Sequence, residues 1–103
     1  MKRFADYQGR QIRLTNERLA HILTHPEMVN MEAAIPAVLL NPEVVRQSRT
    51  DMTVSLYYLY QRATFVGDKW LCVVVKYLEA DAFVITAYLT DKLKPGAQIW
   101  PNP

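Results

Sequence analysis

Several features that define large protein classes are scarce or absent in this chain of 103 residues. A single cysteine, Cys72, excludes an intramolecular disulfide, so we expect a reducing, cytoplasmic location and a buried structural thiol. Only three glycines occur, and they form no phosphate-binding glycine loop. No apolar run approaches the ~20 residues of a membrane-spanning helix, and no apolar stretch follows the basic start. We therefore expect neither a membrane span nor a secretory signal.

Charge of one sign is not in excess either. Twelve Lys and Arg residues face ten Asp and Glu residues, and the net charge of +2 is too small to indicate nucleic-acid binding by itself. The arginines are unevenly placed, however, since Arg46, Arg49 and Arg62 all fall in the middle third. With 50% hydrophobic residues the chain is typical of a globular protein. Its length fits one domain over residues 1–103, in which the polar residues 1–9 are expected to be a loosely held arm.

Helical patterns occupy the first half of the chain after this arm. Thr15 has the residue type and position of a helix N-cap. The helix is expected to end near His25, because Pro26 disfavours a helical conformation in the residue before it. A second helical pattern covers residues 26–40. Pro36 lies inside it, so the helix either kinks there or begins just before the proline.

The second half has the Val-, Ile-, Tyr- and Thr-rich composition of strands. A regular strand is expected over Thr53–Arg62, and a less regular one over Glu43–Thr50. Only four residues separate Trp70–Leu78 from Phe83–Thr90, which predicts an antiparallel hairpin. The expected fold class is α+β, with N-terminal helices packed on one face of a roughly four-stranded antiparallel sheet. Ile99 and Trp100 are an apolar anchor that we expect to fold back onto the domain.

Alternation along the predicted hairpin separates two faces. In its second strand one face is expected to carry Phe83, Ile85, Ala87 and Leu89, and the other Val84, Thr86, Tyr88 and Thr90. In its first strand Lys76 interrupts an apolar set, so its ammonium group must reach the edge, find a partner or face an open cleft. The polar groups Lys76, Thr86 and Tyr88 therefore mark one face of the sheet as the expected place of function.

His21 and His25 are four residues apart and hence neighbours on one helix face. A zinc-protease motif needs a Glu directly after the first His, and Ile22 stands there instead. Neither a second cysteine nor a third histidine exists to complete a metal site, so we expect no metal. Two interpretations remain: a partly exposed pair near a helix end, or acid/base catalysis by a group that titrates near neutral pH.

Two further sets could bind a ligand: the basic residues Arg46, Arg49, Arg62 and Lys76, and the tyrosines Tyr57, Tyr58 and Tyr60. Guanidinium and ammonium groups bind phosphate or carboxylate, although each is also a common solvated surface charge or ion-pair partner. The tyrosines have the residue type and spacing of cross-strand packing residues. An aromatic strip beside arginines is also a platform on which unpaired bases stack.

Four short motifs carry a resemblance to a known family: HILTHPEM, NPEVV, LCVVVKY and VITAYLTD, in this order. Together they resemble small phage-type members of the barnase–EndoU–colicin–RelE-like nuclease superfamily, over about residues 10–100. The pattern of that superfamily is helices before a four-stranded antiparallel sheet. The resemblance thus implies the same element order that the periodicity predicts.

The resemblance implies metal-independent cleavage of RNA, without a cofactor, in which the ribose 2′-hydroxyl attacks the adjacent phosphate. This chemistry needs a base, an acid for the leaving oxygen and cations for the developing charge. Carried over to this chain, His21 is the acid/base candidate, and Arg46 or Arg49 holds phosphate together with Lys76. Thr86 and Tyr88 would orient the phosphate or donate a hydrogen bond to it. The strip of Tyr58, Tyr60 and Arg62 is the expected further contact with RNA.

Other functions remain open at this point. The modest net charge departs from the strongly basic toxins of the superfamily, so a non-catalytic RNA- or protein-binding module of the same fold is the alternative. A phage or toxin–antitoxin role would imply RNA as substrate and an antitoxin as protein partner. A third interpretation is a structural protein that associates with itself, with Trp70, Trp100 and the tyrosines in a subunit interface.

Overall fold

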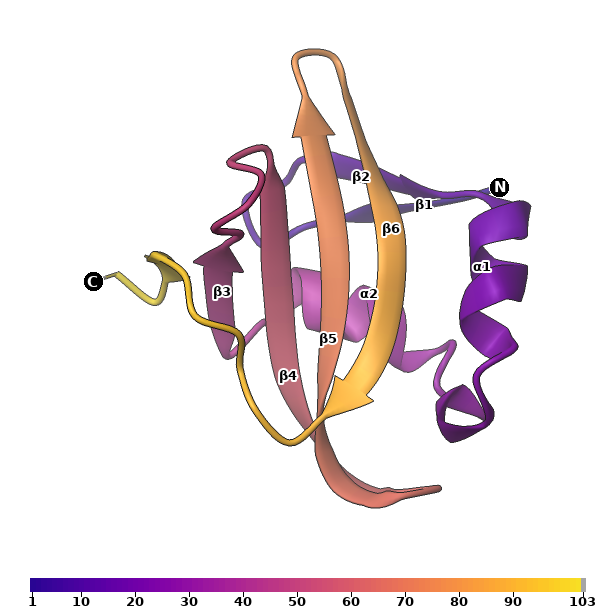
Figure 1. The fold of residues 1–103 in the computed structure, drawn as a ribbon. Helices are drawn as coiled ribbons and strands as arrows, with labels where there is room; N and C mark the ends of the chain where they lie inside the picture. Colours follow the sequence, from indigo (N-terminus) through magenta and orange to yellow (C-terminus); the bar gives the residue numbers. More distant parts are fainter. Residues whose placement is uncertain (103) are drawn as a thin grey trace.

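A mixed, seven-stranded sheet forms the body of the protein in the computed structural model, which describes residues 1–102 (Figure 1). The strands are β1 (Lys2–Ala5), β2 (Gln11–Leu14), β3 (Val44–Gln47), β4 (Val54–Thr64), β5 (Gly67–Leu78), β6 (Asp81–Thr90) and β7 (Gln98–Trp100). Their spatial order is β1-β2-β6-β5-β4-β3-β7. Two short α-helices, α1 (Asn16–Leu23) and α2 (Ala34–Leu40), and the 3₁₀ turn η1 (Pro26–Met28) separate β2 from β3. No helix among these described residues is long and apolar enough to cross a membrane.

The expected fold class, helices on a four-stranded antiparallel sheet, is wrong. The sheet has seven strands. Strand β2 pairs in parallel with β6 through Arg13 and Phe83, and all other strand pairs of the sheet are antiparallel. The three additional strands β1, β2 and β7 are only three or four residues long. In β2 the alternation of Ile12 and Leu14 with Arg13 fits a short edge strand or an extended lead-in, whereas β1 and β7 carry too little alternation to be recognised in a sequence.

The expected loose arm over residues 1–9 is also wrong, because β1 pairs with β2 as a hairpin and Phe4 lies opposite Ile12. The turn is built around Asp6, whose Oδ1 accepts hydrogen bonds from the backbone N–H groups of Gln8 and Arg10, at 2.9 and 2.8 Å. Gly9 adopts φ +85° in this turn, a conformation that glycine reaches without steric cost. A side chain that organises the backbone in this way therefore replaces the hydrophobic pattern as the cause of the hairpin.

Both helices begin where local chemistry allows. The predicted N-cap is confirmed, since the Thr15 side chain accepts a hydrogen bond from the backbone N–H of Arg18 at 3.1 Å. Helix α1 ends at Leu23, two residues before the predicted end. Helix α2 begins just before Pro36, which places the proline in the first turn, where its missing N–H costs no helical hydrogen bond.

The helices cover one face of the sheet, which we call the helix face, and the opposite face carries no helix (Figure 1). Strand β4 alternates between them as predicted: Tyr57 packs in the core of the helix face, and Leu56 and Tyr58 pack on the helix-free face. The core of the helix face comprises Ile12, Leu14, Ile22, Met28, Met31, Ile35, Val38, Leu39, Val45, Tyr57, Leu71, Val73, Val75, Ala82, Val84 and Ala87. The core of the helix-free face is smaller and consists of Val54, Leu56, Tyr58, Cys72 and Val74.

A β-bulge in β6 overturns part of the predicted face assignment. Val74 pairs with Thr86 and Val75 pairs with Val84, so Ile85 is an additional residue without its own partner. As a result Val84 joins Ala87 and Leu89 on the helix face, whereas Ile85 joins the helix-free face. Thr86 and Tyr88 keep the helix-free face that was expected for them.

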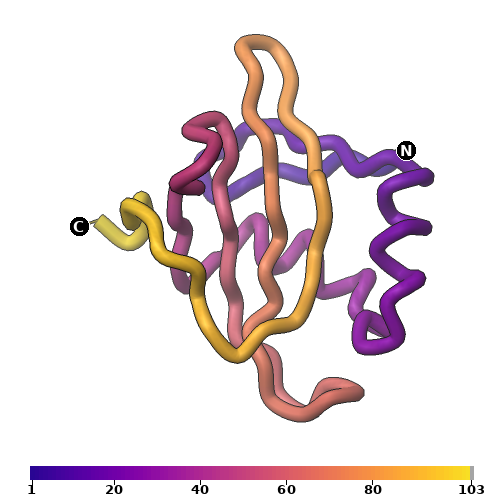
Figure 2. The backbone as a smooth tube through the Cα atoms, in the orientation of Figure 1, coloured from indigo at the N-terminus to yellow at the C-terminus, as the bar shows by residue number. Residues whose placement is uncertain are grey.

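After β6 the chain runs to the opposite edge of the sheet, beside β3, through residues 91–97, which we call the strap (Figures 1 and 2). The backbone N–H of Lys94 donates to the Tyr58 hydroxyl at 3.0 Å, and Gln47 N–H donates to the carbonyl of Ala97 at 2.8 Å. Beyond the strap β7 pairs with β3, and Trp100 Nε1 donates to the carbonyl of Pro42 at 3.2 Å. The predicted return of the apolar anchor onto the domain is confirmed.

Candidate functional site

A hollow of about 420 Å³ lies on the helix-free face, and we refer to it as the strap hollow. It is lined by Ser48, Arg49, Thr50, Asp51, Val54, Leu56, Val74, Thr86, Tyr88, Lys94 and Pro95. These residues come from the β3–β4 loop, from three central strands and from the strap. The apolar lining comes mainly from the central strands, and the polar and cationic groups from the loop, from β6 and from the strap. Such a combination of apolar surface and few polar groups is typical of ligand sites.

The two cationic groups of the strap hollow have no acidic partner. Arg49 and Lys94 are both exposed, and neither forms an ion pair within residues 1–102. The ammonium of Lys94 lies 5.6 Å from the centre of the Tyr88 ring, a cation–π distance. Their positive charges are therefore available to an anionic ligand.

Asp51, the acidic residue in the lining, is already engaged. Its carboxylate accepts from the Thr53 hydroxyl at 2.6 Å and from Lys76 Nζ at 3.0 Å. The Thr53 hydroxyl, and then Lys76, lower the pKa of Asp51 to about 2, so it stays ionised at neutral pH. Lys76 thus finds a partner, one of the three outcomes expected for it, and reaches the strap hollow only through Asp51.

Of the predicted catalytic residues, Thr86 and Tyr88 line the strap hollow. Within the described residues neither hydroxyl makes a hydrogen bond. The two differ in that the Tyr88 hydroxyl is buried. Burial, followed by the neighbouring Cys72, raises the pKa of Tyr88, which keeps the phenol neutral. Tyr88 therefore offers the hollow its ring rather than an acid or base.

His21 does not join these groups. It is exposed on α1, a helix whose buried residue Ile22 packs into the core of the helix face. Its ring lies 5.7 Å from that of His25, and His25 Nδ1 lies 3.4 Å from Glu27 Oε1. No cluster of three or more metal-ligating residues occurs in the chain from residue 1 to 102. The histidine pair is thus a surface feature, separate from the strap hollow.

Arg46 and Tyr58 are part of the framework and are not open to a substrate. Arg46 Nη1 donates to the Lys94 carbonyl at 2.9 Å, and its Nε is buried without a partner. Tyr58 is 0% exposed and accepts the Lys94 N–H, and burial, followed by the neighbouring Cys72, raises its pKa to about 12. Both side chains hold the strap, and with it Lys94, over the sheet.

Tyr60 and Arg62 lie further along β4 and do not line the strap hollow. Tyr60 is 38% exposed and packs edge-on against Trp70, with ring centres 5.1 Å apart. The Arg62 guanidinium lies 5.5 Å from the Tyr60 ring and 3.9 Å from Asp68. These residues form an aromatic and cationic patch that is distinct from the hollow.

Sequence reasoning missed a polar cluster on the helix face. Asp6 is 1% exposed and accepts hydrogen bonds through Oδ2 from Arg10 Nε at 2.8 Å, Tyr77 at 2.9 Å and Tyr57 at 3.2 Å. The Tyr57 and Tyr77 hydroxyls also contact one another. Asp6 followed by Gly9 is a turn signal that could have been read, but the convergence of Tyr57 and Tyr77 on it follows from tertiary structure.

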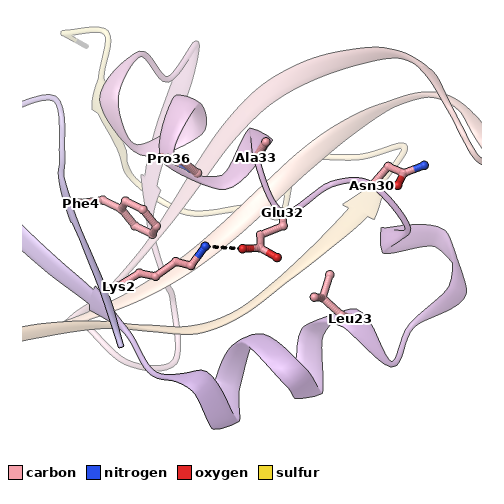
Figure 3. Close-up of a pocket in the computed structure, with 7 residues that line it drawn as sticks. All are labelled: Lys2, Phe4, Leu23, Asn30, Glu32, Ala33 and Pro36. Carbon is pink, nitrogen blue, oxygen red and sulfur yellow. Dashed lines mark hydrogen bonds and ion pairs between the residues drawn. The ribbon is translucent and has the colours of Figure 1, made fainter.

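A larger hollow, of about 590 Å³, lies between β1 and the segment that leads into α2 (Figure 3). Its two charged residues, Lys2 and Glu32, point toward one another and form an ion pair. Phe4 and Leu23 contribute apolar surface beside the pair (Figure 3). Because its charges satisfy one another, this hollow is a weaker candidate for an ionic ligand than the strap hollow.

Comparisons with protein-family models, with curated proteins and with solved structures find no match to this chain. The resemblance to the barnase–EndoU–colicin–RelE-like superfamily therefore stays a prediction.

Proposed function

We propose that this chain binds single-stranded RNA through the strap hollow and does not use His21 to cleave it. One observation carries the proposal: Arg49 and Lys94 line the same largely apolar hollow, which also includes Tyr88. Neither cation has an acidic partner in the described part of the chain. Cations beside an aromatic and apolar surface suit phosphate and an unpaired base together. A cytoplasmic setting, where RNA is abundant, accords with the free and buried Cys72.

The position of His21 argues against the cleavage mechanism that the resemblance implies. General acid–base catalysis needs the proton-transfer group within hydrogen-bond reach of the reacting oxygen. The strap hollow contains no histidine, its carboxylate is held by Lys76 and Thr53, and its tyrosine hydroxyl is buried. What remains are cations and hydroxyl donors, which are sufficient for binding.

The proposal is tested by fluorescence anisotropy with a labelled, unstructured RNA oligonucleotide at several salt concentrations. We expect Arg49→Ala and Lys94→Ala each to weaken binding about tenfold and to reduce the slope of log K against log salt by about 0.7, the value for one phosphate contact in a single strand. The matched control is Arg18→Ala, which removes an exposed arginine of α1, outside the hollow. Equal losses for Arg18 and Arg49 would show non-specific attraction and contradict the proposed site.

A cleavage assay separates binding from catalysis. Total RNA incubated with the protein in EDTA should stay intact, without 2′,3′-cyclic phosphate ends. Cleavage that His21→Ala abolishes would overturn the proposal and restore the mechanism implied by the resemblance. A protein that binds no RNA, but whose Arg49 and Lys94 variants lose a protein partner, would place the function in the protein-binding class instead.

A further inference from the structure

A third cavity, of about 370 Å³, lies beside the polar cluster of Asp6 on the helix face of the sheet. It is lined by Tyr7, Gln8, Arg10, Val45, Gln47, Met52, Thr53, Ser55, Tyr77 and Ile99. The loop between β1 and β2, which contributes Arg10, lies behind β3 and β4 in the view of Figure 1. We call this space the Arg10 cavity. It shares no lining residue with the strap hollow and needs a separate explanation.

The Arg10 guanidinium is held in one orientation. Its Nε donates to Asp6 Oδ2 at 2.8 Å, and its Nη2 reaches the Tyr57 hydroxyl at 3.5 Å. Its Cζ atom lies 4.1 Å from the centre of the Tyr77 ring, so the ring also supports one side of the guanidinium plane. These contacts use the edge of the guanidinium formed by Nε and Nη2. Among residues 1–102, the end formed by Nη1 and the second N–H of Nη2 has no hydrogen-bond partner. The free end has the geometry that binds two oxygens of one oxyanion.

Several side chains that can donate hydrogen bonds line the Arg10 cavity. The hydroxyls of Tyr7 and Ser55 line it and make no hydrogen bond within residues 1–102. Burial raises the pKa of Tyr7, so its hydroxyl keeps its proton. The lining contains no Asp or Glu, and Asp6 behind it already accepts from Gln8, Arg10, Tyr57 and Tyr77. An anionic ligand in this space would therefore meet hydrogen-bond donors and no carboxylate in the lining.

Part of the lining is apolar, and we call it the apolar wall. Val45, Met52 and Ile99 contribute to the lining, together with the ring of Tyr7, which packs against Trp100 with ring centres 5.3 Å apart. Apolar surface in the same cavity as a fixed guanidinium favours an anion that carries an apolar body over a small, fully hydrated ion.

From this geometry we infer that the Arg10 cavity binds a small organic oxyanion, a carboxylate or phosphate monoester, with the end of the Arg10 fork on the oxyanion and the apolar wall on its body. Tyr7 and Ser55 donate further hydrogen bonds to the same group. Asp6 does not touch the ligand and acts as a positioning residue for Arg10. This site is independent of the proposed RNA binding on the other face.

The test is a titration of the ¹⁵N-labelled full chain, followed by NMR, with phenyl phosphate, benzoate, inorganic phosphate and phenol as probes. Phenyl phosphate and benzoate should shift the amide signals of Arg10 and Ser55 saturably, with dissociation constants of about 1 mM or below. Phenol lacks the oxyanion and inorganic phosphate lacks the apolar body, so both should bind at least about tenfold more weakly.

Variants separate a binding role from a structural one. Ser55→Ala and Tyr7→Phe each remove one donor, and should weaken phenyl phosphate binding about threefold to tenfold while the melting temperature stays near that of the wild type. Arg10→Lys keeps the charge but loses the fork, and should weaken it more than tenfold. The matched control, Tyr60→Phe on β4 outside both hollows, should bind as the wild type does.

Three results would each overturn the inference. The first is that the wild type shows no saturable shifts with phenyl phosphate or benzoate up to about 20 mM, roughly 20 times the expected dissociation constant. The second is unchanged binding in Ser55→Ala and Tyr7→Phe, which remain informative even if Arg10→Lys fails to fold. The third is inorganic phosphate binding as tightly as phenyl phosphate, which would leave the apolar wall without a role.

Discussion

At the scale of single residues, Asp6 accepts more hydrogen bonds than any other side chain in residues 1–102. Burial opposes its ionisation, but hydrogen bonds from the Arg10 backbone, from Tyr77, from the Arg10 side chain and from Gln8 together lower its pKa. A buried carboxylate that accepts from so many donors is a structural anion rather than a proton acceptor for catalysis. Its contribution is to tie the β1–β2 turn to β4 and β5 through Tyr57 and Tyr77.

The variant Asp6→Asn should lower the free energy of unfolding by about 2–3 kcal/mol at pH 7, because an amide NH₂ would face donors that now share a carboxylate. The folded-state pKa of Asp6 lies below its unfolded value, so the stability it confers is complete above about pH 4. That stability is lost as the pH falls through the folded-state pKa. Urea denaturation at pH 7 and pH 2.5 should therefore show a smaller difference between variant and wild type at the lower pH.

Asp81→Asn provides the comparison. Asp81 pairs with Arg13 at 2.7 Å on the surface, with 40% of its side chain exposed, so its loss should matter much less at pH 7. A difference between wild type and Asp6→Asn that stays constant down to pH 2.5 would contradict the assignment of Asp6 as a stabilising anion.

At the scale of secondary-structure elements, the strap depends on close backbone contact. A Cβ added at Gly96 would lie 2.1 Å from the carbonyl oxygen of Gln47, which also sits in β3. Main-chain atoms cannot move aside as a flexible side chain would. Glycine is therefore required at this point for the strap to lie against β3.

Gly96→Ala should lower the free energy of unfolding by about 1–3 kcal/mol, because the strap must lift from β3 to make room. Since Lys94 lies two residues away and its carbonyl is bound by Arg46, the same variant should also weaken RNA binding. Ala97→Ser is the matched control, as it adds one atom at the exposed neighbouring residue. Thermal unfolding and anisotropy measure the two effects, and a Gly96→Ala protein that matches Ala97→Ser in both would refute the contact.

Elements were predictable from the sequence where local chemistry decides them. The Thr15 cap, the early position of Pro36 in α2 and the two faces of β4 all follow from neighbouring residues. The bulge at Ile85 was not predictable, because its residue type fits either face and only the register with β5 reveals the extra residue. Strand β1 and its pairing with β2 were missed since Asp6, rather than an apolar alternation, organises the turn between them.

At the scale of the whole molecule, the central strands carry most of the buried surface. Strand β5 lies between β4 and β6 and is buried continuously from Leu71 to Val75, whereas every residue of β7 is exposed. Opening of the edges should therefore cost much less free energy than opening of the centre.

Native-state hydrogen exchange should reflect this gradient. The amides of Leu71, Val73 and Val75 should exchange only through global unfolding, and those of β7 and the strap through local opening at least about 100-fold faster. Exchange rates measured by NMR at low denaturant give the comparison. Equal protection of β7 and β5 would mean that the strap is an integral part of the core.

The candidate site was predictable only in part, because some of its residues are placed by tertiary contacts and not by a local sequence pattern. Alternation placed Thr86 and Tyr88 on the helix-free face, and Arg49 reaches them from the next loop of the same sheet. Lys94 was missed because the strap has no strand or helix pattern, and its path is fixed by contacts with Tyr58 and Arg46. His21 was placed with the site by resemblance, but α1 packs through Ile22 and leaves His21 exposed.

The order of the strands has a consequence for synthesis of the protein. Strand β6 pairs with both β2 and β5, and the outer edge of β3 is closed by β7. A nascent chain that has reached Leu78 therefore exposes unpaired N–H and C=O groups on both sides, beside hydrophobic residues that the helices cover only in part. Incomplete chains of this kind should be the species most in need of a chaperone, and that need should end once β6 and β7 have paired with their neighbours.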